Sequence, residues 1–200
     1  ESWYEIDDAQ DLDHATLIFS EPNQRYKLLS GRYGGYWRFE HIKDFCYLVN
    51  PYFPPETLNN EIKFSLPKLM QSYPSGEKVQ AMLGGKLFGV PSSHIVVGNG
   101  AAELIEKLTG FLGGRFGIYG PTFEEYPARF GNIEYRESNA RGFTYGKKEI
   151  TELAEENDGV ILINPDNPSG NFICYEDLIN ILEQLKYLDK YLVVDESFLD

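Results

Sequence analysis

The sequence predicts an α/β fold in which helices cover both faces of a mainly parallel sheet. From residue 76 onward, short apolar runs alternate with segments whose apolar residues recur every three or four positions. Wholly apolar strands are typical of parallel sheets, because both faces of such a sheet are buried. Several runs stop at glycine or proline, which end strands and start turns. Strands that alternate with amphipathic helices indicate the α/β class.

The expected elements follow one another along the chain. Helical periodicity covers residues 56–73, although Pro67 can kink or split this helix because proline lacks a backbone N–H. Strands are expected at residues 94–97, 115–119, 132–136, 160–163 and 191–194. Further helices are expected at residues 104–112, 123–130, 147–156 and 175–190.

The first 56 residues have a different character. They are rich in Tyr, Trp and Phe, with the segment Gly31–Arg38 at the centre. We expect an extended arm that packs against something other than its own domain. An arm that folds onto its own domain is an equal alternative.

Composition and charge argue against several classes of partner. The chain has 200 residues, and an apolar content of 42% is enough to build a core. Its 31 acidic residues outnumber 18 basic ones, and the net charge of −13 disfavours nucleic acid and anionic membrane surfaces. Two cysteines, Cys46 and Cys174, are too few for a disulfide framework and favour a reducing, cytoplasmic location.

Three strand ends carry the residues most suited to chemistry, since ligands of open α/β sheets bind beyond the carboxyl ends of the strands. Gly98–Glu103 leads from a strand into a helix, whose free N–H groups can bind an anion. Asn164–Gly170 is a tight double turn that presents the amide of Asn167. Asp195 follows a buried strand, where a carboxylate needs a cation or a hydrogen-bond donor.

Each of these features also has a structural interpretation, as a simple turn, a helix cap or an ion pair. Together and in this order they predict a site for pyridoxal phosphate (PLP), with the phosphate at the helix N-terminus. Asn167 would donate to the 3-oxygen of the pyridine ring. Asp195 would pair with the ring nitrogen and keep it protonated, which strengthens the ring as an electron sink.

Further motifs resemble those of one family. Asn50–Pro55, Tyr73-Pro74 and Pro121–Tyr126 precede Asn167–Gly170 and Val193–Glu196. On these motifs the chain resembles the fold-type I, PLP-dependent class I/II aminotransferases, and within them the histidinol-phosphate aminotransferase and threonine-phosphate decarboxylase branch. The resemblance covers about residues 30–200 and implies the large domain of that fold with an N-terminal arm.

The resemblance implies a role for each matching residue. The backbone amides of Gly100, Ala101 and Ala102 would hold the cofactor phosphate, while Phe123 would stack on the pyridine ring beside the catalytic Asp195. A plain core aromatic is the alternative for Phe123.

The same resemblance implies a homodimer, since the family builds its sites at a subunit interface. Tyr73 would reach the phosphate of the cofactor bound by the partner subunit. Tyr52 would contact the substrate, with anchoring of the arm as its alternative role.

The implied reaction is amino-group transfer between an amino acid or amino-phosphate and a 2-oxo acid. Phe198 occupies the place where the aminotransferases usually carry a tyrosine, and Tyr33-Gly34-Gly35 is similar to a His-Gly-Gly element of threonine-phosphate decarboxylases. Decarboxylation of a phosphorylated amino acid is therefore the alternative.

The family's Schiff-base lysine is expected beyond Asp200, and Lys186 and Lys190 are expected to be solvated. We expect a piece of a longer enzyme, and a non-catalytic fragment is the third alternative.

A second resemblance lies at the front of the sequence. Trp3–Leu12 is similar to the closing segment of sugar-nucleotide and phosphocholine nucleotidyltransferases, which implies that Asp7 helps to bind Mg²⁺. An acidic, solvated arm is the alternative. The expected organisation is a nucleotidyltransferase tail at residues 1–20, a connecting segment and arm at 21–56, and part of the PLP-dependent large domain at 57–200.

Overall fold

The computed structural model describes residues 3–32, 34–39, 42–45, 49–138 and 141–199. The chain divides into two compact units, residues 1–73 and residues 74–200. Tyr33 and Cys46, which the sequence singled out, lie outside the described residues.

The second unit is built around a four-stranded parallel sheet. Its strands lie in the order β2-β1-β3-β4, and every neighbouring pair is parallel. The α/β class with a mainly parallel sheet is therefore confirmed. The strands are β1 (Phe116–Gly120), β2 (Ile133–Glu137), β3 (Gly159–Ile163) and β4 (Tyr191–Asp195).

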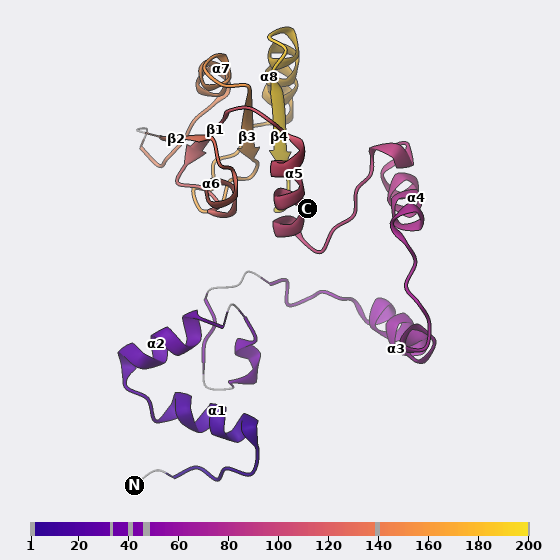
Figure 1. Ribbon diagram of the computed structural model, residues 1–200, viewed down its shortest axis with the longest axis vertical. Helices are drawn as coiled ribbons and strands as arrows, with labels where there is room; N and C mark the ends of the chain where they lie inside the picture. Colours follow the sequence, from indigo (N-terminus) through magenta and orange to yellow (C-terminus); the bar gives the residue numbers. More distant parts are fainter. Residues whose placement is uncertain (1–2, 33, 40–41, 46–48, 139–140, 200) are drawn as a thin grey trace. The chain divides into compact units, whose positions relative to one another are not determined.

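Helices cover both faces of this sheet, as Figure 1 shows. On one face, α5 (Ala101–Phe111) and α6 (Glu125–Arg129) enclose a cluster that includes Ile105, Phe116 and Tyr126. On the other face, α7 (Lys147–Glu155) and α8 (Tyr175–Tyr187) enclose a second cluster. Apolar stripes on the helices therefore meet the apolar faces of the strands in two cores.

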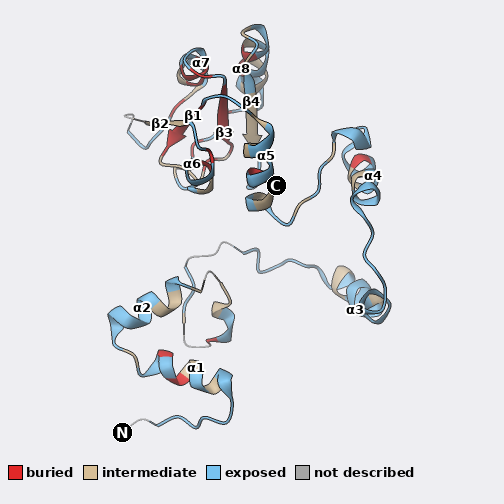
Figure 2. Cartoon of the chain, viewed as in Figure 1, coloured by how far each residue is buried: buried red, intermediate tan, exposed pale blue. Residues whose placement is uncertain are grey.

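Strand β3 links the two cores, because every residue in it is buried (Figure 2). Val160 and Leu162 belong to the cluster beneath α7 and α8, while Ile161 and Ile163 belong to the cluster beneath α5 and α6. Successive side chains of a strand point to opposite faces, so an unbroken apolar run supplies both cores.

One expected strand is absent. Residues 92–94 form a short 3₁₀ helix, and residues 95–98 form no strand in the described part of the chain. Val96 and Val97 are exposed there. The turn Gly98–Glu103 therefore does not follow a strand end, contrary to the prediction from the sequence. A β-branched run becomes a strand only when a neighbour satisfies its backbone groups, and local sequence does not reveal that neighbour. Conversely, α4 (Glu77–Phe88) was not expected.

The first unit is mainly helical. It contains α1 (Ala9–Ile18), α2 (Pro22–Ser30), a 3₁₀ turn at Tyr36–Arg38, and α3 (Glu56–Met70). Residues 9–30 are thus not the extended arm that the aromatic composition predicted. A capping box starts α1, in which the Asp8 side chain accepts from the backbone N–H of Asp11 at 2.9 Å. The Asp13–Arg32 ion pair ties this segment together.

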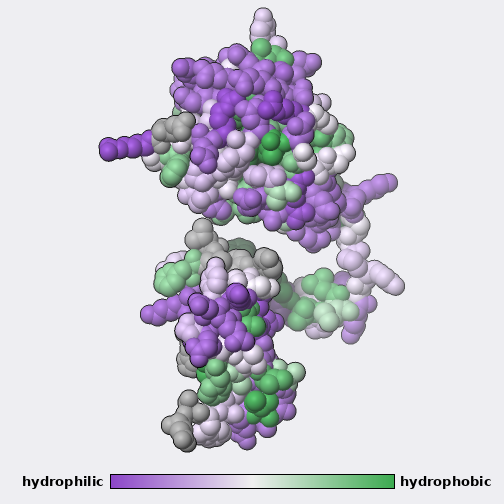
Figure 3. Space-filling view, turned by 60° about the vertical axis from the view of Figure 1, so that its left-hand side comes forward, coloured by the Kyte–Doolittle hydropathy of each residue, from purple (hydrophilic) through white to green (hydrophobic). Residues whose placement is uncertain are grey.

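Helix α3 continues through Pro67, which lies inside it and does not split it. Its apolar side chains are open to solvent, and Phe64 is 90% exposed. Figure 3 shows hydrophobic side chains open at the surface of the molecule. None of the helices within the described ranges combines the length and the apolar character that crossing a bilayer requires.

Candidate functional site

The carboxyl ends of the parallel strands of the second unit lie at one edge of the sheet. Ile163, the last residue of β3, is in register with Asp195, the last residue of β4. The backbone N–H of Asn164 donates to the carbonyl oxygen of Asp195 at 2.8 Å, so the two strands separate only beyond this point. The turn that carries Asn167 therefore begins beside Asp195, at the paired ends of β3 and β4.

The carboxyl group of Asp195 is held by donors on both oxygens. The Tyr126 hydroxyl donates to Oδ2 at 2.9 Å. The backbone N–H of Ser197 donates to Oδ1 at 2.9 Å, and the Ser197 hydroxyl donates to the same oxygen. No Lys, Arg or His within the described residues forms an ion pair with Asp195. The strand end thus presents an oriented acidic group without a protein cation.

Tyr126 lies at the candidate site, but sequence reasoning assigned it no role. It lies inside the motif Pro121–Tyr126, but only Phe123 received a role from that motif. Its side chain is 3% exposed, and burial raises the pKa of Tyr126 above its ordinary value, with the Asp195 charge adding to the effect. Tyr126 therefore stays a neutral phenol and acts as a donor. The signal available in the sequence was the helical spacing of Phe123, Tyr126 and Phe130, which resembles ordinary core periodicity.

A hollow of about 190 Å³ lies between α5 and the end of β4. It brings together Ala101 from the predicted phosphate-binding turn and Asp195 from the predicted ring-nitrogen partner. These two residues are 94 positions apart in the sequence, and the fold brings both of them to the lining of one hollow. Its lining residues are Ala101, Leu104, Ile105, Leu108, Tyr126, Val193, Val194, Asp195, Glu196 and Ser197.

The N-terminus of α5 is open for an anion. Gly100 caps the helix with a φ of +82°, a conformation that favours glycine, and no side chain caps the first turn. The first N–H groups of a helix have no partner within it, so they are available to a phosphate. The prediction for Gly100, Ala101 and Ala102 is compatible with this geometry.

Glu103 stabilises the turn before α5. Its carboxylate accepts from the Asn99 backbone N–H at 2.6 Å and pairs with Lys107 Nζ at 2.9 Å. The Asn99 hydrogen bond, followed by the Lys107 charge, lowers the pKa of Glu103 to about 2. The carboxylate is therefore charged at neutral pH and keeps Asn99 fixed beside Gly100.

A buried carboxyl group connects the loop after β1 to the loop after β3. Asp166, only 4% exposed, accepts from the Thr122 hydroxyl at 2.7 Å and from the Ser169 hydroxyl. Thr122 precedes Phe123, and Asp166 precedes Asn167. The connection therefore fixes the start of both segments that the sequence assigned to the cofactor ring.

Phe123 and Asn167 lie at this edge of the sheet but do not line the hollow itself. Phe123 is half-buried and packs against the core beneath α5 and α6. The Asn167 side chain has no hydrogen-bond partner within the described residues and is half-buried. Both roles toward the ring stay predictions.

Two amide side chains hold the Asn167 turn in place. Asn164 exchanges two hydrogen bonds with the backbone of Ile173, at 2.9 and 2.8 Å. Asn171 does the same with the backbone of Tyr145, at 3.0 and 3.3 Å. These buried amides satisfy backbone groups that the turn would otherwise leave unpaired.

The remaining predicted residues lie in the first unit. Tyr52 and Tyr73 are 88% and 101% exposed, and their roles toward substrate and the partner subunit's cofactor stay predictions. Asp7 is exposed as well, and its backbone N–H donates to Asp11 Oδ2 at 3.1 Å. Within the ranges that the structure describes, no group of three His, Cys, Asp or Glu side chains could hold a metal. The Mg²⁺ role of Asp7 therefore stays a prediction too.

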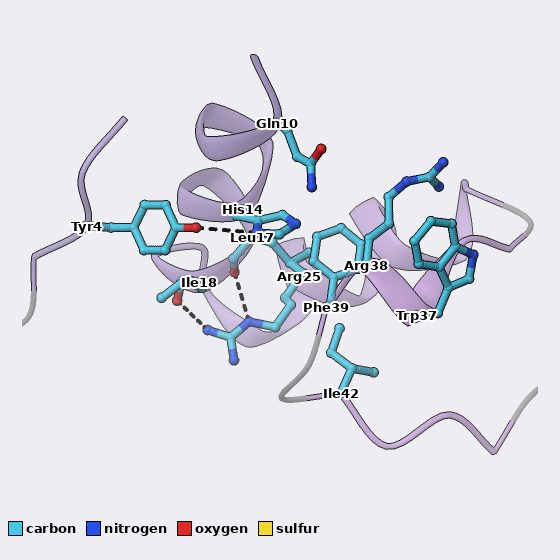
Figure 4. A pocket seen from close by; sticks show the side chains of 10 residues that line it. All are labelled: Tyr4, Gln10, His14, Leu17, Ile18, Arg25, Trp37, Arg38, Phe39 and Ile42. Atoms are coloured by element: carbon cyan, nitrogen blue, oxygen red, sulfur yellow. Dashed lines mark hydrogen bonds between the residues drawn. The ribbon is translucent and has the colours of Figure 1, made fainter. Parts of the chain in front are cut away.

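The first unit contains a larger hollow of about 640 Å³, which Figure 4 shows. His14 lies in it between the Tyr4 hydroxyl, 3.3 Å from Nδ1, and the Phe39 ring, 4.9 Å from the imidazole between centroids. The Arg25 guanidinium donates to backbone carbonyls at the end of α1. None of the predicted site residues lines this hollow, Asp7 included.

Comparison with known proteins supports the fold of the second unit. No family model matches the chain. It is 31% identical over 170 residues to the L-serine phosphate decarboxylase Cj1436c of Campylobacter jejuni, covering 78% of this chain and 43% of that protein. A decarboxylase structure from Sulfurospirillum multivorans matches with a TM-score of 0.68 at 27% identity, over 77% of this chain and 42% of that chain. Histidinol-phosphate aminotransferases occur among both the relatives and the similar structures.

The chain is a relative of the PLP-dependent class I/II aminotransferase-fold proteins. The resemblance inferred from the motifs is thereby confirmed, and these related families use PLP.

One relative is similar to this chain over its whole length, and therefore over both of its units. The CMP-5'-(3-aminopropyl)phosphonate synthase of Streptomyces rubellomurinus is 28% identical over 203 residues, covering 100% of this chain and 32% of that protein. The chain spans less than half the length of the synthase and of the Campylobacter decarboxylase.

Proposed function

We propose that residues 74–200 bind PLP and that the complete protein uses it to transform an amino compound bearing a phosphate or phosphonate group. The observation that carries this proposal is the hollow shared by Ala101, at the open N-terminus of α5, and the oriented carboxyl group of Asp195. The names of the relatives support the substrate class, since serine phosphate, histidinol phosphate and aminopropylphosphonate each combine nitrogen with a phosphorus oxyanion.

The residues present fit the cofactor. The uncapped N–H groups at Gly100, Ala101 and Ala102 would hold its phosphate, because a helix N-terminus attracts an anion. Asp195, which forms no ion pair with a cation of the described residues, would hold a proton at the ring nitrogen. When bound, PLP supplies an electron sink for the electrons released at the substrate carbon.

The remaining residues would orient the ring. Phe123 would lie against its face, and Asn167 would donate to its 3-oxygen. The Thr122–Asp166 hydrogen bond would keep both of them in place.

Amino-group transfer to a 2-oxo acid is the first reaction type that we propose. Decarboxylation of a phosphorylated amino acid is the second, and a specific observation favours it. Phe198 has no hydroxyl where aminotransferases usually carry a tyrosine, and the decarboxylase of Sulfurospirillum multivorans matches the chain at a TM-score of 0.68.

The first unit supports a further part of the proposal. The synthase whose printed name includes a CMP group matches the whole chain, whereas the Campylobacter decarboxylase covers 78% of it. We therefore propose that residues 1–20 are the tail of a nucleotidyltransferase domain, with Asp7 helping to bind Mg²⁺. We also propose a homodimer in which Tyr73 reaches the cofactor of the partner subunit and Tyr52 contacts the substrate.

The experiment uses the full-length protein. Purified protein is titrated with PLP and followed by absorbance, with Asp195→Asn as the matched variant. Phosphoserine, phosphothreonine and histidinol phosphate are then supplied with and without 2-oxoglutarate. Glutamate formation identifies transfer, whereas CO₂ release that needs no 2-oxo acid identifies decarboxylation. No PLP binding, or equal binding and turnover in Asp195→Asn, would contradict the proposed site.

A further inference from the structure

The Tyr126 hydroxyl is a buried donor aimed at the end of β4. It lies 2.9 Å from Asp195 Oδ2, although the two residues are 69 positions apart in the chain. The ring packs in the core beneath α5 and α6, where the Tyr126 and Phe130 centroids are 6.2 Å apart. A ring enclosed in this way cannot swing away from Asp195, so the hydrogen bond has one geometry.

The two oxygens of Asp195 have different surroundings. Oδ1 accepts from the backbone N–H and the hydroxyl of Ser197. Oδ2 accepts from Tyr126. A carboxylate oxygen can accept two hydrogen bonds, so Oδ2 keeps one acceptor position. Tyr126 and Asp195 both line the hollow.

We propose that Tyr126 is a positioning residue that fixes the plane of the Asp195 carboxyl group and sets how a proton is shared between Oδ2 and the ring nitrogen of bound PLP. This inference rests on the proposed function. By donating to Oδ2, the Tyr126 hydroxyl draws negative charge away from that oxygen, which leaves the proton on the ring nitrogen. A ring nitrogen that keeps its proton is the better electron sink.

Among the described residues, Tyr126 is the one side chain that donates to Oδ2. Ser197 is already bonded to Oδ1, and the other residues that line the hollow from α5 are apolar. Removing one hydroxyl therefore alters one oxygen, while the packing of the aromatic ring is retained.

The test measures the ring nitrogen directly. Full-length protein is loaded with PLP labelled with ¹⁵N in the ring, and the nitrogen chemical shift is recorded for wild type, Tyr126→Phe and Asp195→Asn. Tyr119→Phe is the matched control, because Tyr119 is also a buried tyrosine, 7% exposed, but it lies in β1 and packs on the opposite face of the sheet against Tyr145.

We expect Tyr126→Phe to move the nitrogen signal toward that of unprotonated pyridine and Tyr119→Phe to leave it unchanged. Replacing Tyr126 by 3-fluorotyrosine keeps the hydroxyl and makes it a stronger donor, so the signal should move in the opposite direction. This second variant preserves the test if Tyr126→Phe folds poorly.

The outcomes separate this inference from the function on which it rests. A signal that Asp195→Asn shifts but that neither change at Tyr126 shifts would overturn the inference alone. A wild-type protein that binds no PLP would overturn the proposed function and this inference with it. A purely structural role for Tyr126 would lower the unfolding temperature without opposite shifts in the two variants.

Discussion

The Thr122–Asp166 connection allows a quantitative test of how the two loops at the sheet edge are held. Asp166→Ala removes the acceptor of two side-chain hydrogen bonds, from Thr122 and Ser169. A hydrogen bond contributes about 1 kcal/mol net, and more when the acceptor is charged. Asp166 is almost fully buried, whereas both hydroxyl partners are half-buried and can regain water. We expect a loss of about 2 kcal/mol in the free energy of unfolding.

A double-mutant cycle isolates the connection itself. Thr122→Val removes the hydroxyl with little change of shape and should cost about 1 kcal/mol. If the two residues act through one bond, the double variant should lose about 1 kcal/mol less than the sum of the single variants.

The choice of probe matters for this experiment. Both tryptophans of the chain, Trp3 and Trp37, lie in the first unit, so tryptophan fluorescence does not follow the sheet. Amide hydrogen exchange at Ile161 and Ile163 of the buried strand β3 reports the stability of the second unit. A coupling energy within about 0.3 kcal/mol of zero, the usual scatter of additivity, would refute the reasoning.

Further predictions concern single residues. Asp195→Asn should lower turnover of the full-length protein at least ~10²-fold, because it removes a charge aimed at the ring nitrogen; nearly unchanged turnover in a steady-state assay would contradict that role. Tyr73→Phe should weaken PLP retention in equilibrium dialysis without altering the circular dichroism spectrum, and a monomer in sedimentation that retains PLP normally would count against it. Glu103 should titrate with a pKa of about 2 instead of its ordinary 4.5 in carboxyl ¹³C NMR. Because this pKa is lowered, the stabilising contact with Asn99 is fully present above pH 4.5 and is lost as the pH falls toward about 2. A titration midpoint near pH 4.5 would show that the contact does not persist in solution.

Local patterns predicted much of the second unit. The apolar runs at residues 160–163 and 191–194 became β3 and β4 within one residue at each end, and residues 147–156 became α7. These segments have a periodicity that leaves one secondary structure able to bury their apolar side chains. The order of the strands along the chain also predicted that Asn167 and Asp195 follow successive strand ends.

Pairings between distant segments could not be predicted in this way. The β-branched run at residues 94–97 formed no strand, because strand formation depends on a partner elsewhere in the chain. The aromatic content of the arm predicted an extended segment. The structure instead has helices α1 and α2 there, with a capping box at Asp8 and an Asp13–Arg32 ion pair.

By itself, the sequence determined the α/β class, the parallel sheet and the candidate residues at the ends of β3 and β4, since each depends on periodicity or on residue type within a few positions. Only the tertiary structure decided which of them meet. Tyr126 reaches Asp195 across 69 positions, and Thr122 reaches Asp166 across 44. Both hydrogen bonds depend on the parallel alignment of strands, which brings the carboxyl ends of distant segments to one edge and leaves no trace in the local spacing of residues.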